Sequence, residues 1–190
     1  GPTDRARLEQ LAVAQRSKLT VIELRDFAAR VERDVMLTRH FVEPTAGALS
    51  RIARVLRATV EGVLDAGVQP VRVKVEHESE PSLDHYDAEH YHEVHVKLRI
   101  AAEAYDATWA WLRDTGEEMG WRPSRNPYAR QADGVVQFVT MRAYEGTRAD
   151  VDARVEQALA RLGGRGIRPV EVKRETTVLD TRRDHDAWWV

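Results

Sequence analysis

Glu93, His95 and Lys97 alternate with apolar residues in one short segment of the chain. An alternation of period two is typical of a β-strand, and it places these three side chains on one face. The same alternation surrounds Lys74 and Lys173, so three of the chain's four lysines occur in one kind of segment. A carboxylate, an imidazole and an ammonium group on a shared face can bind an anion and transfer a proton. The alternative is a solvated face on which lysine and glutamate pair across strands, each pair contributing about 0.2–1 kcal/mol.

The residues of this charged face divide into two predicted roles. His95 is the candidate acid–base residue, Glu93 orients it, and Glu175 supplies a second catalytic carboxylate. The predicted ligand-binding residues offer a positive charge or an amide to a phosphate or carboxylate group, and they are Lys97, Arg125, Asn126 and Arg142. The hypothesis requires that these side chains share one side of the sheet. The sequence leaves open whether the chain is an enzyme, and it indicates no particular cofactor.

A second candidate for chemistry is the histidine-rich segment 77–95, which contains five of the seven histidines. His90 and His92 are predicted to share one strand face, and Glu93 and His95 the other. Two imidazoles and a carboxylate can hold a divalent metal, so His90, His92 and His95 are candidate ligands. The alternative is a polar hairpin that changes its charge near neutral pH.

The composition restricts the classes of protein to consider. The chain has 190 residues, of which 43% are hydrophobic and 32% charged, and it contains no cysteine. The lack of cysteine excludes disulfides and thiolate chemistry. A net charge of −2 gives no general attraction to nucleic acid, so none is predicted as a partner. We find no membrane span or signal peptide and expect a cytoplasmic protein, and the frequent arginine and alanine are typical of a bacterium with a GC-rich genome.

The apolar pattern predicts a helical N-terminal extension followed by an α+β domain. Residues 1–2 match the remnant of a cleaved expression tag, residues 3–33 are predicted to form the extension, and residues 34–190 the domain. In the extension, Thr20 and Glu23 match a capping box, although a strand from Leu19 to Leu24 is an alternative. The predicted strands are 35–42, 71–76, 91–100, 135–144 and 170–179. The predicted helices lie at 44–67, 105–120 and 147–163, and the predicted loops at 78–89 and 121–133.

An internal similarity guides the prediction of the fold. Residues 38–76 and 140–175 each contain a strand, a helix, a glycine and a strand that ends in a lysine–glutamate pattern. We interpret them as two β-α-β units of one sheet. The predicted architecture is a mostly antiparallel or mixed sheet of about five strands with ferredoxin-like packing, helices on one face and the charged residues on the other.

The second half of the chain resembles a family of small, functionally uncharacterised bacterial proteins. The shared motifs are Glu93-x-His95-Val-Lys97, Ser124-Arg125-Asn126, Phe138-Val-Thr140-x-Arg142, Arg174-Glu175-x-x-Val178-x-Asp180 and Asp186-x-Trp188. The resemblance covers residues 90–190 and implies candidate positions on the charged face without implying a reaction. A more distant resemblance is to triphosphate-tunnel enzymes, which have a characteristic glutamate–lysine motif. Here Glu171-x-Lys173-x-Glu175 contains these residue types in a different order.

A non-catalytic function is the main alternative. Trp188 and Trp189 near the end of the chain are typical of residues that cover a core edge or contact a second copy. In that case the charged residues pair internally, and the chain is an interaction or dimerisation module.

Overall fold

The computed structural model describes residues 2–25, 31–39, 48–78, 90–131 and 134–184. The chain divides into two compact units, of which Gly1–Val21 and Asp34–Val71 form the first, and Ile22–Arg33 and Arg72–Val190 the second. The predicted boundary between residues 33 and 34 therefore does not separate an extension from a domain. No helix among the described residues has the length and apolar character needed to cross a membrane.

The first unit contains two helices, α1 (Pro2–Ala14) and α2 (Ala48–Asp65). Leu11 and Val63 are buried, one on each helix. Gly62 lies so close to the side chain of Gln15 that any larger residue at position 62 would overlap it. Gly67 follows α2 with φ of 72°, the left-handed conformation that glycine often adopts after the end of a helix.

The predicted helix over residues 3–33 is wrong after residue 14. Strand β1 (Lys18–Arg25) and strand β2 (Val31–Thr38) occupy most of its second half. Residues 20–22 are three consecutive β-branched residues, which lose side-chain freedom in a helix and fit the pleated surface of a strand. Their preference for a strand outweighs the capping-box match of Thr20 and Glu23.

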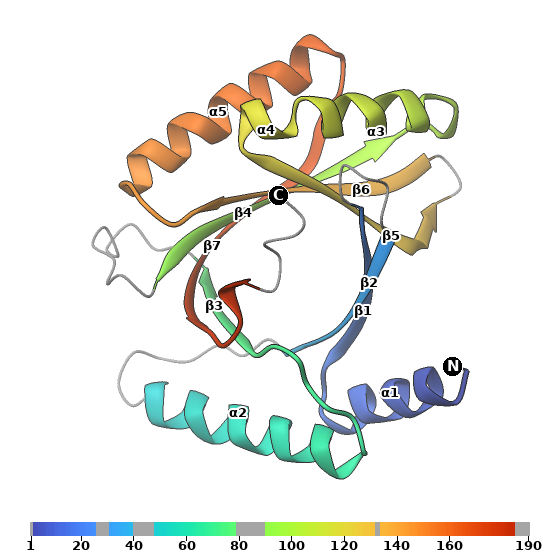
Figure 1. Cartoon of the computed structure of the whole chain (residues 1–190), viewed down its shortest axis with the longest axis vertical. Helices are drawn as coiled ribbons and strands as arrows, with labels where there is room; N and C mark the ends of the chain where they lie inside the picture. The colour runs from blue at the N-terminus through green and yellow to red at the C-terminus, as the bar shows by residue number, and fades with distance from the viewer. Residues whose placement is uncertain (1, 26–30, 40–47, 79–89, 132–133, 185–190) are drawn as a thin grey trace. The chain divides into compact units, whose positions relative to one another are not determined.

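The strands follow the order β2-β1-β5-β6-β4-β7-β3 (Figure 1). The second unit contains β3 (Lys74–Glu78), β4 (Tyr91–Ile100), β5 (Trp121–Gln131), β6 (Gly134–Ala143) and β7 (Pro169–Asp180). Every pair whose register is described is antiparallel. The predicted α+β class is confirmed, and of the two predicted arrangements the described strand pairs follow the antiparallel one, with seven strands in the order rather than about five.

Two β-α-β units form the centre of this sheet. The first is β4, α3 (Tyr105–Asp114), α4 (Gly116–Met119) and β5, with a short 3-10 turn (Ala102–Ala104) before α3. The second is β6, α5 (Arg148–Gly164) and β7. In each β-α-β unit the two strands are parallel, and one strand of the other β-α-β unit lies between them. The resulting order β-α-β-β-α-β is the one found in ferredoxin-like connectivity.

The internal similarity in the sequence identifies only the second β-α-β unit, which consists of β6, α5 and β7. β2 and β3, which contain the strands of the supposed first copy, lie at opposite ends of the strand order. Residues 38–76 therefore do not form a β-α-β unit of this kind, because five other strands lie between β2 and β3 in the strand order. An amphipathic pattern records only that each element has one apolar face, and it does not record which partner covers that face.

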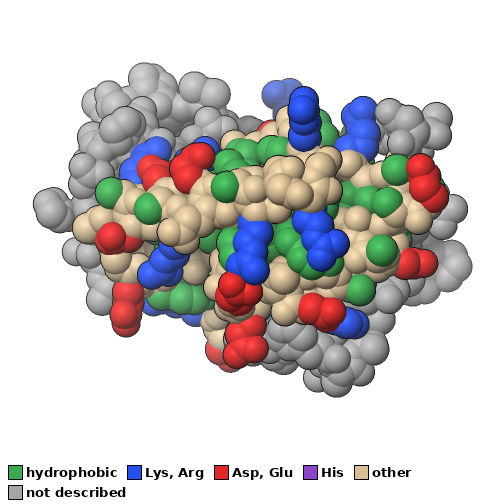
Figure 2. All heavy atoms as spheres, turned by 90° about the horizontal axis from the view of Figure 1, so that it is seen from above, with side chains coloured by type: hydrophobic (Ala, Val, Ile, Leu, Met, Phe, Trp, Pro, Cys, Tyr) green, Lys and Arg blue, Asp and Glu red, His purple; other side chains and the backbone are tan. Residues whose placement is uncertain are grey.

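Helices α3, α4 and α5 lie on one face of the second unit's sheet, as predicted (Figure 1). The side chains between the two layers are apolar and come from alternate strand positions, and they include Val94, Val96, Leu98, Ile100, Val139, Met141, Leu112, Val155 and Leu162. Charged side chains of both signs alternate with apolar ones on the outer surface of the helical layer (Figure 2). The alternate positions of β4 point to the opposite side, which we call the open face.

Trp121 fixes the start of β5. Its side chain is fully buried, and its indole nitrogen donates a 2.8 Å hydrogen bond to the carbonyl of Leu112. Gly116 permits this contact, because a Cβ at that position would lie 2.9 Å from the carbonyl oxygen of Trp121. Segment 121–133 was predicted to be a loop on account of its prolines, yet Trp121–Gln131 is a strand. Asn126 and Pro127 coincide with a register shift between Arg125 and Arg130, so β5 accommodates them as an irregularity, whereas Pro123 stays in register with Val139.

α5 begins as the sequence predicts. The Thr147 hydroxyl accepts a hydrogen bond from the backbone of Asp150, and the Asp150 carboxylate accepts one from the backbone of Thr147. This is the reciprocal arrangement of a capping box. Residues 79–89 and 185–190 lie outside the described residues, and with them His85 and the tryptophans proposed to contact a second copy.

Candidate functional site

The strand register gathers the predicted charged residues in rows on the open face. On β4, Glu93 lies opposite Arg142 on one side and Glu175 on the other. The next row on the same face contains Thr140 of β6, His95 of β4 and Lys173 of β7. Lys97 follows one further row along β4. His95, Lys97, Arg142 and Glu175 therefore share one side of the sheet, as the anion-site hypothesis requires.

Glu93 is the centre of this cluster. Its side chain is only 1% exposed, and one of its oxygens lies 3.0 Å from both Nε and Nη2 of Arg142. The other oxygen accepts a hydrogen bond from the ammonium group of Lys74. Burial by itself raises the pKa of Glu93, but the positive charges of Arg142 and Lys74 outweigh it and lower the pKa to about 2. The carboxylate is therefore ionised at neutral pH.

Lys74 of β3 joins two carboxylates. Its ammonium group contacts Glu76 as well as Glu93, and it lies 5.6 Å from the ring centroid of Tyr91. Burial lowers the pKa of Lys74, while Glu93 and Glu76 raise it by a larger combined amount, so the pKa is well above its usual range. From the sequence, Lys74 was expected on the charged face but was given no role in the site. The signal that could have identified it is the rarity of lysine in this arginine-rich chain.

His95 lies between a hydroxyl group and two carboxylates. Its Nδ1 is 3.0 Å from Oγ1 of Thr140. Its Nε2 is 3.4 Å from Oε2 of Glu175 and 3.8 Å from Oε1 of Glu93. The imidazole is 30% exposed, so it can be reached from solvent. These contacts agree with the predicted neighbourhood of His95, with Glu175 the nearer carboxylate.

Two lysines flank the histidine along the face. Lys173 lies 2.6 Å from Oε1 of Glu175, whose side chain is 7% exposed. Lys97 makes a looser contact of 3.6 Å with Glu171, and both of those side chains are substantially exposed. The ammonium group of Lys97 is therefore weakly held, and Lys97 lies beside the cluster of buried ion pairs.

Arg125 and Asn126 belong to β5, and their side chains lie outside the described part of the structure. In the backbone register Arg125 pairs with Gln137, whereas Ser124 pairs with Phe138. Phe138 is in turn the partner of Lys97 across β4. In the register, it is Ser124 and not Arg125 that belongs to the row of Lys97. The structure therefore does not place Arg125 in the same set of alternating positions as Lys97 and Arg142.

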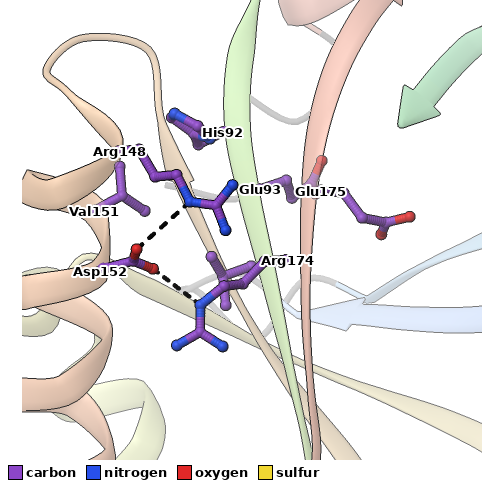
Figure 3. Close-up of a pocket in the computed structure, with 8 residues that line it drawn as sticks. His92, Glu93, Arg148, Val151, Asp152, Arg174 and Glu175 are labelled. Carbon is purple, nitrogen blue, oxygen red and sulfur yellow. Dashed lines mark hydrogen bonds and ion pairs between the residues drawn. The ribbon is translucent and has the colours of Figure 1, made fainter. Parts of the chain in front are cut away.

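The histidine candidates for a metal are divided between the two faces of β4. His92 is buried under α5, in a hollow of about 10 Å³ that has room for roughly one water molecule. Asp152 ion-pairs there with Arg174 at 2.9 Å and with Arg148 at 3.6 Å (Figure 3). Because His95 faces the opposite side of the strand, His92 and His95 do not meet at one metal position.

A different set of residues has the geometry of a metal site. One ligand atom each from Glu76, Glu93 and His95 lies within 4.8 Å of the others. The ammonium of Lys74 already contacts both of these carboxylates. A divalent ion would have to compete with this ammonium for the same oxygen atoms.

A tyrosine hydrogen-bonded to an ion-paired aspartate lies at one end of the cluster. The hydroxyl of Tyr91 donates a 2.7 Å hydrogen bond to Asp180, which also accepts a 2.8 Å hydrogen bond from Nε of Arg72. Burial is the largest cause that raises the pKa of Tyr91 to about 12. The guanidinium of Arg183 lies 5.4 Å from the ring of Tyr91 and 5.1 Å from that of Tyr144. These contacts hold the end of β7 against β3 and β4.

No protein-family model, curated protein or solved structure matches this chain. The geometry of the open face is therefore the basis for any statement about its function.

Proposed function

We propose that the open face of the second unit binds an anionic small molecule with a phosphate or carboxylate group, and that His95 transfers a proton there. The observation that carries this proposal is the position of His95: its imidazole is partly exposed, is oriented at Nδ1 by Thr140, and faces a carboxylate at Nε2. An imidazole held at both nitrogens and still open to solvent suits a general acid or base. Cationic side chains on either side supply attraction for an anion.

The contacts favour different roles for the two glutamates. Glu175 lies closest to Nε2 of His95 and is the better candidate to orient it and stabilise its charged form. Glu93 is fully ionised and held on both oxygens by Arg142 and Lys74. A carboxylate with a pKa of about 2 is a weak base, so we assign Glu93 the role of holding the cations in position.

Binding can be measured by the thermal unfolding of the chain in phosphate, pyrophosphate or malonate, with chloride at the same ionic strength as reference. The proposal predicts a rise in Tm with at least one of these anions. His95→Gln is expected to change the NMR chemical shifts induced by the anion, whereas the matched variant His90→Gln, at the position just before β4, is expected to leave them unchanged. Equal Tm values in every salt, with no shift changes near His95, would exclude an anion site on this face.

A metal site is a second candidate, favoured by the proximity of Glu76, Glu93 and His95. Oxygen and imidazole ligands together suit Mn²⁺ or Zn²⁺. Lys74→Met removes the competing ammonium group and should raise the affinity for Mn²⁺, as measured by calorimetry, if the three residues are ligands. His92→Gln should have no effect. Absence of Mn²⁺ or Zn²⁺ binding to both the original chain and Lys74→Met would eliminate this candidate.

A further inference from the structure

Arg122 is a half-buried arginine of β5 that makes no ion pair with any described residue. Its Nη1 donates a 3.1 Å hydrogen bond to the backbone carbonyl of Trp121. By contrast, Arg142 and Arg174 pair with the carboxylates of Glu93 and Asp152. Arg122 thus has no counter-ion among the described residues, and partial burial of a charge that lacks a counter-ion costs free energy.

Charges of both signs, Glu117 and Arg142, lie near Arg122, and Glu117 has the stronger effect on its pKa. Burial is the main cause that lowers its pKa, and the positive charge of Arg142 lowers it further. Glu117 acts in the opposite direction, but it forms no ion pair with Arg122 among the described contacts. An arginine remains protonated in any case, so the unfavourable energy persists until a negative charge approaches. Two neighbouring guanidinium groups of this kind are a typical setting for an oxyanion.

The strand register places Arg122 beside the proposed acid–base residue. Arg122 pairs with Thr140, and Thr140 pairs with His95 on its other side. Neighbouring strands are about 4.8 Å apart, so Arg122 and His95 stand roughly 10 Å apart with Thr140 between them. His95 leans toward Thr140, since its Nδ1 lies 3.0 Å from the hydroxyl oxygen. Arg142 occupies the next position of the same face along β6.

We infer that the partly exposed side chains of Arg122, Arg142 and His95, which surround the buried Thr140, form a subsite for the phosphoryl group of a small phosphorylated molecule, with Arg122 as its main guanidinium ligand. This inference rests on the proposed function and makes it more specific, because it places the anion at Arg122 rather than at Lys97. Arg122 and Arg142 can donate from two sides of Thr140, whose hydroxyl proton is directed at Nδ1 of His95. Two guanidinium groups on different sides can contact different oxygens of a tetrahedral phosphoryl group, whereas a planar carboxylate offers two oxygens to one arginine fork.

The test compares Arg122→Gln with Arg168→Gln, which removes the same charge from an exposed position before β7. Inorganic phosphate is the probe, malonate is the carboxylate reference, and ionic strength is kept constant with chloride. We expect phosphate to raise the Tm of the original chain and of Arg168→Gln equally. Arg122→Gln is expected to bind phosphate at least tenfold more weakly, with an unchanged or higher Tm in the absence of phosphate. Arg122→Lys, which keeps the charge without the planar fork, should fall between the two.

The outcomes separate this inference from the proposed function. If no anion binds the original chain, both are wrong. If phosphate binds the original chain and Arg122→Gln equally, but binds Lys97→Met weakly, the face binds anions and the subsite is misplaced. If malonate binds and phosphate does not, the phosphoryl assignment is wrong and an anion site remains. A marked fall in the Tm of Arg122→Gln without phosphate would show that Arg122 has a structural role, which would overturn the inference.

Discussion

Arg142 places Nε and Nη2 at 3.0 Å from a single oxygen of Glu93, across the pairing of β6 with β4. The two residues are direct partners in the register, so the contact requires no distortion of the sheet. The second oxygen of Glu93 is occupied by Lys74 from β3. One buried carboxylate thus connects side chains from three strands that are distant in the sequence, and the arrangement of the cations on the open face depends on it.

Glu93→Gln should destabilise the second unit by about 3 kcal/mol, because it removes the buried carboxylate that pairs with both Arg142 and Lys74 and leaves Lys74 paired with Glu76. The matched variant is Glu171→Gln, which removes a carboxylate whose contact with Lys97 is exposed to solvent. Its effect should stay below about 1 kcal/mol. Urea unfolding followed by circular dichroism measures both variants. Similar losses in the two would contradict a central role for Glu93.

The low pKa of Glu93 predicts how the free energy of unfolding depends on pH. Its pKa is about 2 in the folded chain, against an ordinary value of 4.5, so the unfolded chain binds a proton that the folded chain does not. The stabilisation is therefore fully present above pH 4.5 and is lost as the pH falls toward 2. The free energy of unfolding of the original chain should decrease by a few kcal/mol over this interval. Glu93→Gln should show a clearly weaker dependence, and an equal slope would assign the acid sensitivity to other carboxylates.

The sequence predicted those elements whose local pattern agrees with their final environment. Strand 91–100 and the helix that starts at Thr147 follow directly from period two and from a capping box. Residues 18–25 were predicted wrongly because a capping-box match was preferred to three consecutive β-branched residues. The strand order could not be obtained from such patterns, since an amphipathic strand specifies one buried face and leaves its neighbours undetermined.

The same limit explains which site residues could be predicted. Glu93 and His95 lie two residues apart on one strand, so their shared face follows from alternation alone. Their partnership with Glu175 also required that β7 pair with β4, which the sequence did not specify. Lys74 and Arg122 come from β3 and β5, and their positions depend on register and on the contact between Trp121 and Gly116. These long-range constraints have no local signal in the sequence.

Gly116→Ala tests the contact that positions β5. A Cβ at this position would meet the backbone carbonyl of Trp121 at 2.9 Å, and a backbone atom cannot move aside as a flexible side chain can. We expect a loss of about 1–3 kcal/mol from the resulting strain. Gly163→Ala in α5 is the control, because the space around that position is open and alanine favours a helix over glycine by about 1 kcal/mol. Unfolding curves that move in the same direction for both variants would contradict this account.

The hydrogen bond between Thr140 and His95 determines which imidazole nitrogen carries the proton. Nε2 faces two carboxylates, which accept hydrogen bonds and do not donate them when ionised, so the neutral ring should carry its proton there. Nδ1 then accepts from the Thr140 hydroxyl. Thr140→Val removes this donor, and the two tautomers of His95 should become more equally populated.

Two-bond ¹H–¹⁵N spectra of the imidazole rings distinguish these tautomers at a pH where His95 is neutral. In the original chain, Nε2 should give the signal of a protonated nitrogen and Nδ1 that of an unprotonated one. In Thr140→Val the two signals should move toward each other, whereas Thr177→Val on β7 should leave them unchanged. A protonated Nδ1 in the original chain would mean that Thr140 accepts the hydrogen bond, that Nε2 directs a lone pair at two carboxylates, and that the assignment of Glu175 as the residue orienting His95 is wrong.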